Sequence, residues 1–157
     1  MSHPQSTSEE LERQAAKLLH ELSLKEKISM KERLAIPRQV PATLDPIERA
    51  KCQSEVESTL TPAQAVVEAM RCIQCKNRPC ISGCPVQIDI PEFLHLTAQG
   101  DFAAAIATIK RTSLLPAVCG RVCPQEKQCQ LFCTVGKTHK DVQKAVGIGK
   151  VERFLAD

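Results

Sequence analysis

Eight of the nine cysteines fall into two runs whose spacing is short enough to bring their thiols together. The first run is Cys72-x2-Cys75-x4-Cys80-x3-Cys84, and Pro85 follows it directly. The second is Cys119-x3-Cys123-x5-Cys129-x3-Cys133, with Pro124 after its second cysteine. Thiolates at such intervals can converge on a soft metal centre, and a Cys-Pro pair in a tight run is typical of loops that hold [4Fe–4S] clusters. The spacing therefore indicates two such clusters and an electron carrier.

Three other uses of cysteine fit this pattern less well. Zinc is commonly held by two C-x2-C pairs, and only Cys72 and Cys75 have that spacing. Disulfides need an oxidising compartment, whereas residues 1–30 contain several glutamates and no apolar core of a signal peptide. Ordinary core thiols would not gather into two runs. A zinc-stabilised assembly module without a redox role stays open as an alternative, which the visible absorption of iron–sulfur clusters would separate from the first interpretation.

Composition argues against several other functions. The chain has 157 residues, enough for one domain with an extension, and its four aromatic residues are all phenylalanine. The net charge of +3 and the lack of aromatic residues among the basic ones argue against nucleic-acid binding. No apolar stretch approaches the roughly 18 to 20 residues that span a bilayer. We expect a cytoplasmic protein with a modest core, which bound clusters would cross-link.

The segments before the first cysteine run have clear helical and extended patterns. Residues 1–7 are polar and are expected to be disordered. Residues 8–22 form an amphipathic pattern that is equally consistent with packing on the same domain and with docking to a partner. Three prolines predict an extended segment over residues 35–46. Asp45-Pro46 and Thr61-Pro62 each offer an N-cap followed by proline at the first helical position.

The segments after the first run also predict helices. Pro91 begins a short one that ends at Gly100, and Asp101 caps the next. A last helix is expected over residues 141–155, from its spacing of valines and phenylalanine. No convincing strand alternation occurs, so the predicted fold class is all-α, with the clusters in loops and at helix ends. We expect an N-terminal extension over residues 1–34, containing the amphipathic helix, and an iron–sulfur domain over residues 35–157.

The sequence around the cysteines resembles one known family. The stretches AMRCIQCKNRPC (69–80), CGRVCP (119–124) and IGKVERF (148–154) occur in the family's order. The family is the N-terminal domain with two [4Fe–4S] clusters of the glutamate synthase small subunit, of dihydropyrimidine dehydrogenase and of the NADH-dependent ferredoxin:NADP oxidoreductase large subunit. The resemblance covers roughly residues 35–157.

This resemblance implies an interleaved set of ligands. The first cluster would be held by Cys72, Cys75, Cys80 and Cys133. The second would be held by Cys84, Cys123, Cys129 and Glu152. Glu152 stands where the family has an amide or carboxylate ligand on its C-terminal helix. Spacing alone instead favours Cys119, because four cysteines are the usual ligand set, so Cys119 is the alternative to Glu152. Cys52 lies outside both runs and is interpreted as a core thiol.

Basic residues crowd the cysteines and are expected to offset the negative charge of a reduced cluster, which would raise its reduction potential. They are Arg71, Lys76, Arg78, Arg121 and Lys127. The alternative is that they are ordinary surface charges, and Lys127 is interpreted in this way.

The resembling enzymes carry flavin- and nucleotide-binding domains beside this one. The pattern Gly147-x-Gly149 lacks a third glycine and follows no predicted strand, so it does not predict a dinucleotide site. We therefore expect a subunit that is not catalytic alone. It would relay single electrons through two clusters, between a partner NAD(P)H-dependent flavoprotein that holds FAD and NAD(P) and another redox centre. The alternative is a fragment of a complete enzyme such as a glutamate synthase small subunit.

Overall fold

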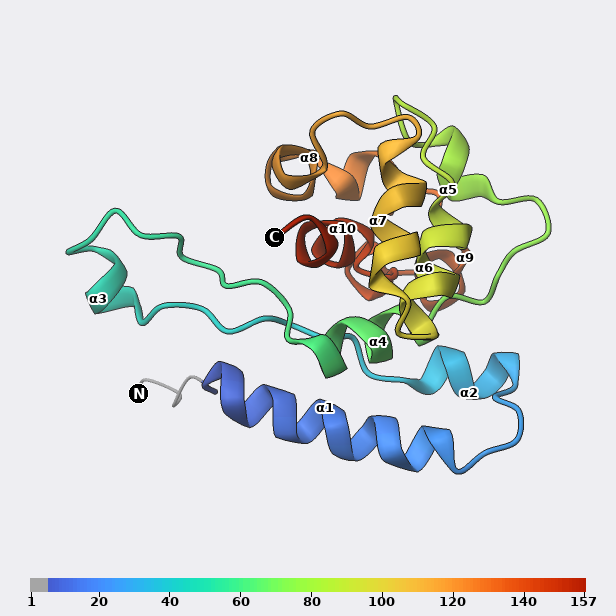
Figure 1. Ribbon diagram of the computed structural model, residues 1–157, viewed down its shortest axis with the longest axis horizontal. Helices are drawn as coiled ribbons and strands as arrows, with labels where there is room; N and C mark the ends of the chain where they lie inside the picture. The colour runs from blue at the N-terminus through green and yellow to red at the C-terminus, as the bar shows by residue number, and fades with distance from the viewer. Residues whose placement is uncertain (1–5) are drawn as a thin grey trace.

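The computed structural model describes residues 6–157, and Figure 1 shows them as a helical body with a protruding arm. The α-helices are α1 Ser8–Ser23, α2 Met30–Ala35, α3 Pro46–Arg49, α4 Pro62–Met70, α5 Pro79–Ser82, α6 Ile90–Ala98, α7 Phe102–Lys110, α8 Pro116–Val122, α9 Thr134–His139 and α10 Ile148–Ala156. Two 3-10 turns, η1 Gln125–Lys127 and η2 Val142–Lys144, lie among them. Within residues 6–157, β pairing is limited to one isolated bridge between Thr43 and Glu57. The all-α prediction is confirmed.

Side-chain caps fix most of the predicted helix starts. Asp45, Thr61 and Asp101 accept hydrogen bonds from the first turns of α3, α4 and α7, as their sequence positions predict. Thr7 likewise accepts a hydrogen bond from the Glu10 amide and begins α1. The prediction of disorder is therefore wrong at Thr7, and for residues 1–5 it lies outside the described residues.

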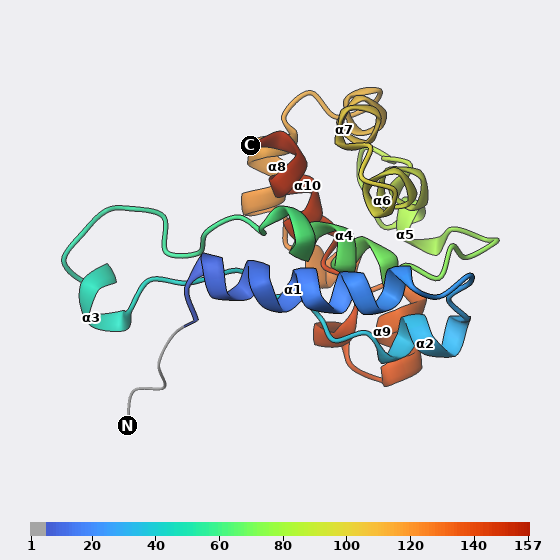
Figure 2. The same ribbon diagram turned by 60° about the horizontal axis from the view of Figure 1, so that its bottom comes forward.

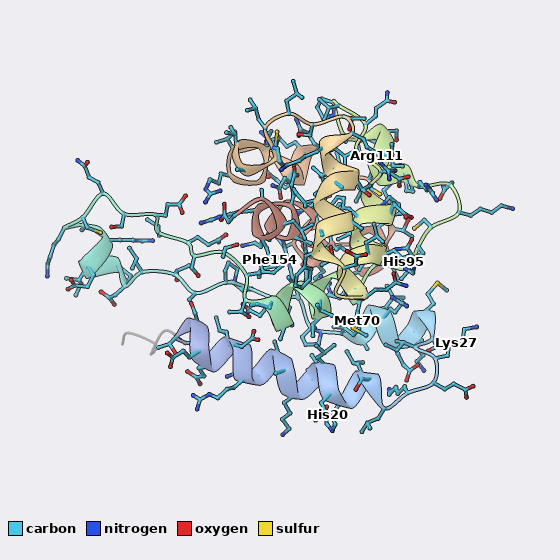
Figure 3. The ribbon with its side chains drawn as sticks, in the orientation of Figure 1. His20, Lys27, Met70, His95, Arg111 and Phe154 are labelled. Carbon is cyan, nitrogen blue, oxygen red and sulfur yellow. The ribbon has the colours of Figure 1, made fainter. Side chains whose placement is uncertain are left out.

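Two hydrophobic cores hold the helices together. The larger one joins α4, α6, α7 and α10 and contains the buried side chains of Phe93, Leu94, Ile109 and Val151. The smaller one contains Leu22 of α1, Ile36 and Val67 of α4. Helix α1 runs along α4 (Figure 2), and Met70 lies where α4 meets the N-terminal helices (Figure 3). Of the two roles left open for the amphipathic helix, α1 therefore packs on its own chain.

An arm formed by residues 42–58 extends away from the body (Figure 1). It pairs with itself, because the Leu44 amide donates to the Val56 carbonyl and the Ser58 amide donates to the Ala42 carbonyl, both at 2.8 Å. Cys52 lies on this arm and is exposed. Its interpretation as a core thiol is wrong, since the arm leaves the body before the chain reaches this residue.

The predicted C-terminal helix over residues 141–155 is broken in the structure. The 3-10 turn η2 ends at Lys144, Ala145 is extended with ψ of 160°, and α10 begins only at Ile148. The carbonyls of Lys144 and Ala145 accept hydrogen bonds from the buried Arg71, and the Gly147 amide donates to the buried Glu68. Side chains from α4 and its C-cap thus take the backbone groups that a continuous helix would have used.

No helix within residues 6–157 is both long enough and apolar enough to cross a bilayer.

Candidate cluster-binding pockets

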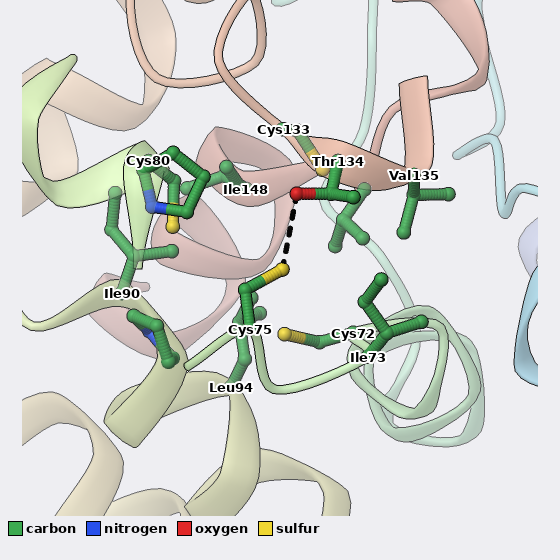
Figure 4. Close-up of a pocket in the computed structure, with 13 residues that line it drawn as sticks. Cys72, Ile73, Cys75, Cys80, Ile90, Leu94, Cys133, Thr134, Val135 and Ile148 are labelled. Carbon is green, nitrogen blue, oxygen red and sulfur yellow. Dashed lines mark hydrogen bonds between the residues drawn. The ribbon is translucent and has the colours of Figure 1, made fainter. Parts of the chain in front are cut away.

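The first pocket gathers cysteines from both runs around one cavity. Its four thiols are those of Cys72, Cys75, Cys80 and Cys133. Figure 4 shows their sulfur atoms turned toward a common space, which encloses about 20 Å³ and is otherwise lined mainly by apolar side chains. The structure therefore brings together the four residues that the resemblance assigned to the first cluster.

Tight local geometry positions these four thiols. Cys72 follows Arg71, the C-cap of α4, and Cys133 is the N-cap of α9. Between Cys72 and α5 the chain turns sharply, with positive φ at Gln74 (50°) and Arg78 (42°). Non-glycine residues rarely adopt this conformation, and such strain gathers at functional sites. The turns fold the first run back on itself, so that its thiols face one point.

Two polar side chains contact the sulfur atoms of the first pocket. The Cys75 thiol donates to Thr134 Oγ1 at 3.1 Å, drawn as the dashed line in Figure 4. Gln74 Nε2 lies 3.5 Å from Cys72 Sγ and also donates to the Pro91 carbonyl at 3.0 Å. Sequence reasoning missed both contacts, although Thr134 directly follows a predicted ligand.

Burial keeps the Cys72 and Cys80 thiols of the first pocket protonated when nothing positive is bound. It raises the pKa of Cys72 to about 11 and that of Cys80 to about 12, and neighbouring thiols contribute to both shifts. A bound cation reverses this preference, because a coordinating thiol is deprotonated outright. The pocket is thus suited to a positively charged, soft centre.

The second pocket gathers five possible donors around a cavity of about 170 Å³. They are the thiols of Cys84, Cys119, Cys123 and Cys129 and the carboxylate of Glu152. Burial raises the pKa of Cys123 to about 11 and that of Cys129 to about 12. The second pocket holds every residue assigned to the second cluster, together with the alternative Cys119.

Glu152 brings a buried oxygen without a hydrogen-bond partner among residues 6–157 to the second pocket. Its side chain belongs to α10 and is only 7% exposed. Within residues 6–157, its Oε1 atom has no hydrogen-bond partner. Loss of water alone raises the pKa of Glu152 to about 7. A buried carboxylate without a partner costs free energy, so a cation in this pocket would relieve it.

Cys119 differs from Glu152 in its surroundings. It lies on α8, and its sulfur is 3.9 Å from Ser113 Oγ. A thiol tolerates an apolar setting better than a carboxylate does. The geometry leaves both residues within the pocket, and the choice between them as fourth ligand stays a prediction.

Close packing of α8 on α10 brings Cys119 and Cys123 beside Glu152. The two helices meet at Gly120, where an added Cβ would lie 2.8 Å from the Arg153 amide nitrogen. A Cβ at Gly149 would in turn overlap the Gln125 side chain. Both glycines are therefore explained by close packing: Gly120 against Arg153, and Gly149 against the Gln125 side chain.

The two pockets share a wall. Ile90 and Ile148 line both cavities, and each is 2% exposed. Nothing in the sequence pattern indicated that these two isoleucines lie between the two sites. Because both side chains are aliphatic, they offer water no polar partner between the pockets.

Most of the basic residues near the cysteines are already paired. Arg71 contacts Glu68 at 2.6 Å, Arg78 contacts Asp89 at 2.9 Å, and Arg121 contacts Glu55 at 2.6 Å. Lys76 and Lys127 are exposed. Paired or solvated cations lose much of their effect on a neighbouring charge, so the expected electrostatic support from these residues is weaker than their number implies.

The donor sets of both pockets fit the iron–sulfur chemistry that the spacing predicts. Clusters of this type are held mainly by thiolates, with occasional replacement of one ligand, and the lining around the sulfur atoms is apolar. Within the described residues, no three His, Cys, Asp or Glu side chains come close enough to hold one metal ion between them.

Comparison with known proteins gives a consistent picture. The family described as dihydropyrimidine dehydrogenase domain II, 4Fe-4S cluster, matches residues 49–157. The glutamate synthase [NADPH] small chain of Halomonas elongata is 38% identical over 122 residues, covering 78% of this chain and 25% of the relative. The NAD-dependent dihydropyrimidine dehydrogenase subunit PreT of Escherichia coli O157:H7 is 39% identical over 103 residues, covering 66% of this chain and 24% of the relative. The chain spans about a quarter of the length of these curated relatives.

Proposed function

Because the chain belongs to the 4Fe-4S family of dihydropyrimidine dehydrogenase domain II, we propose that it relays single electrons through two [4Fe–4S] clusters. Each pocket would hold one cluster. The single observation that carries this proposal is that cysteines of both runs gather around two cavities with apolar linings. The relatives support it, since their names describe oxidoreductases.

The proposed ligands of the first cluster are Cys72, Cys75, Cys80 and Cys133. Those of the second are Cys84, Cys123, Cys129 and Glu152. The buried, unpartnered Oε1 atom of Glu152 supports its role, because no protein group within residues 6–157 competes for it. Cys119 would then be a neighbouring thiol in contact with Ser113.

The surrounding residues would hold, tune and separate the two centres. When bound, a [4Fe–4S] cluster accepts and releases one electron at a time. Gln74 Nε2 already points its N–H at Cys72 Sγ, and the Thr134 hydroxyl, which accepts from the Cys75 thiol, would donate to that sulfur once it is a thiolate ligand. Such hydrogen bonds favour the reduced state by stabilising negative charge. The buried aliphatic side chains of Ile90 and Ile148 would separate the two centres.

We further propose that hydride chemistry takes place on a partner flavoprotein, which would hold FAD and NAD(P). The relatives are named for NADPH- and NAD-dependent enzymes, and this chain matches about a quarter of each. A second candidate is that the chain forms the iron–sulfur part of a complete enzyme like the glutamate synthase small chain, which the 38% identity supports. Thiolate-held clusters favour the reducing cytoplasm as the compartment.

Metal analysis and spectroscopy test the proposal together. We expect about eight irons and about eight acid-labile sulfides per chain, a broad visible absorption and two reduced electron paramagnetic resonance (EPR) spectra. The chain alone should not oxidise NADH or NADPH, and its clusters should be reduced only when a flavoprotein partner is added. About four irons would contradict the two-cluster proposal, and stoichiometric zinc would favour the assembly module instead.

A further inference from the structure

A buried ion pair outside both pockets joins the segments that build them. Glu68, in the last turns of α4, is 0% exposed, and Arg71, the residue before Cys72, is 2% exposed. Their side chains meet at 2.6 Å between Arg71 Nη1 and Glu68 Oε1. Neither side chain lines a pocket, so the ion pair has no part in binding a cluster directly.

The pair is used almost entirely to hold backbone groups from distant parts of the chain. Glu68 accepts the Gly147 amide and the Gln39 amide, each at 2.7 Å. Arg71 donates to the carbonyls of Lys144 at 2.6 Å and Ala145 at 3.1 Å. Its Nε atom donates to the Ile36 carbonyl at 3.1 Å. These bonds fasten residues 144–147 against the end of α4.

Residues 144–147 lead directly into the helix that contributes to both pockets. Gly147 is the N-cap of α10. Ile148, the next residue, forms part of the wall between the pockets, and Glu152 lies one turn further along. The start of α10 therefore decides where the wall and the carboxylate stand relative to Cys72.

We propose that Glu68 and Arg71 are positioning residues that set Glu152 and Ile148 in register with the first cysteine loop. This proposal rests on the proposed function, because it concerns the placement of a ligand of the second cluster. A buried ion pair is often no more stabilising than apolar residues of the same size, so stability alone does not explain it. Charged hydrogen bonds are directional, and five of them here define one position for residues 144–147, Ile36 and Gln39.

Two variants test the pair by different means. Glu68→Gln removes the negative charge from the side chain that accepts a hydrogen bond from the Gly147 amide. Gly147→Ala keeps every charge but places a Cβ 3.3 Å from Glu68 Oε1, which crowds the same contact. Glu32→Gln is the matched control, since Glu32 also pairs with a cation and caps a helix but is exposed and remote from residues 144–147.

The first measurement is hydrogen exchange by mass spectrometry on the peptide that contains Gly147. Loss of a hydrogen bond to a charged group should speed exchange there by roughly tenfold to a hundredfold in Glu68→Gln. The second measurement is the iron content and the reduced EPR spectrum. We expect a changed spectrum and lower occupancy of the second cluster, with the first cluster retained, and a smaller change of the same kind in Gly147→Ala.

Combining Glu68→Gln with Glu152→Ala separates an effect on the position of Glu152 from a general loss of stability. If Glu68 acts through Glu152, Glu68→Gln should cause no further change in the second spectrum of the Glu152→Ala variant. Additive changes would overturn the proposal, as would wild-type spectra of both clusters in Glu68→Gln and Gly147→Ala. If Glu68→Gln does not fold, Gly147→Ala decides the question alone. Absence of a second cluster from the wild-type protein would instead refute the proposed function, and it is measured first.

Discussion

The two cysteine pockets draw on the same residue types but complete their donor sets differently. The first has four thiols, two of which contact Thr134 and Gln74, around a cavity of about 20 Å³. The second has four thiols and a carboxylate around a cavity of about 170 Å³, and the carboxylate has an oxygen without a partner among residues 6–157. A set with one donor more than a cubane needs leaves a choice of ligand, whereas a set of four does not. We therefore expect every thiol of the first site to be required, whereas the fourth ligand of the second site can be identified by substituting Glu152 and Cys119 in turn.

Removing both clusters should have the largest effect on the protein, because it should unfold both pockets alike. The ligands come from segments far apart in the sequence, so two bound clusters would cross-link those segments. We expect chelation or oxidative loss to abolish most of the helical circular dichroism and the cooperative melt. Apoprotein with full helical content would show that the apolar cores alone support both pockets.

Substituting the fifth donor should separate the two pockets most clearly. Glu152→Ala should lower the occupancy of the second cluster or change its EPR spectrum, and it should leave the first cluster intact. The reason is that a carboxylate oxygen is a harder ligand than a thiolate and gives the iron that it binds a distinct spectroscopic signature. Glu152→Cys should give a site with four cysteines. Cys119→Ala should cost only about 1 kcal/mol of stability, the effect of shortening a small buried side chain.

Iron content and reduced EPR spectra of the two alanine variants decide between the ligands. Loss of a cluster in Cys119→Ala, together with two unchanged spectra in Glu152→Ala, would assign the fourth position to Cys119.

A packing change should affect the second pocket without touching a ligand. In Gly120→Ala the new Cβ would lie 2.8 Å from the backbone nitrogen of Arg153, so α8 and α10 must separate. Overpacking of this kind costs about 1–3 kcal/mol, and here it moves Cys119 and Cys123 away from Glu152. Iron analysis and EPR should show reduced occupancy of the second site alone. Gly100→Ala is a useful contrast, because its Cβ position is open and only its positive φ of 80° is strained.

The smallest effect is expected from the ion pairs that tie the arm to the second pocket. Glu55 contacts Arg121 of α8 and Arg153 of α10, and hydrogen bonding from Arg121 lowers its pKa below the usual 4.5. A lowered pKa means that the contribution is present above pH 4.5 and is lost only as the pH falls further. Glu55→Gln should therefore lower the melting temperature slightly, and equally at pH 7 and pH 5.

Melting curves at these two pH values check the sign of this effect. Equal melting temperatures for Glu55→Gln and wild type at both pH values would mean that folding does not lower the pKa of Glu55. Lys51→Gln is a suitable comparison, because Lys51 lies on the same arm but pairs only locally with Glu48.

Local rules predicted most of the helices, because their starts are decided by nearby residues. Asp45, Thr61 and Asp101 each cap a helix through side chains within three residues. The break before α10 could not be predicted this way, since Glu68 and Arg71 satisfy backbone groups more than seventy residues away. The exposed position of Cys52 has the same origin, as nothing near it in the sequence marks the arm that carries it.

The grouping of the cysteines into pockets could be predicted from the sequence only in part. Spacing indicates two four-cysteine runs, but the pockets exchange members, with Cys133 joining the first run and Cys84 joining the second. That exchange was inferred from the resemblance to a family rather than from spacing. The burial of Glu152 was not visible in its neighbours Lys150 and Arg153, whose charges favour an exposed helix face. Contacts such as Cys75 with Thr134 depend on tertiary packing, which no local pattern encodes.

The exchange of cysteines between pockets also sets an order of events during synthesis. A ribosome makes a chain from its N-terminal side onward, so Cys72, Cys75 and Cys80 emerge before Cys133. The second pocket closes later still, because Glu152 comes nineteen residues after Cys133. A nascent chain therefore exposes three thiols of the first site with nothing to complete them. On the proposed ligand sets, insertion of either cluster would wait until these later residues have been made, and the thiols already made would have to stay reduced until then.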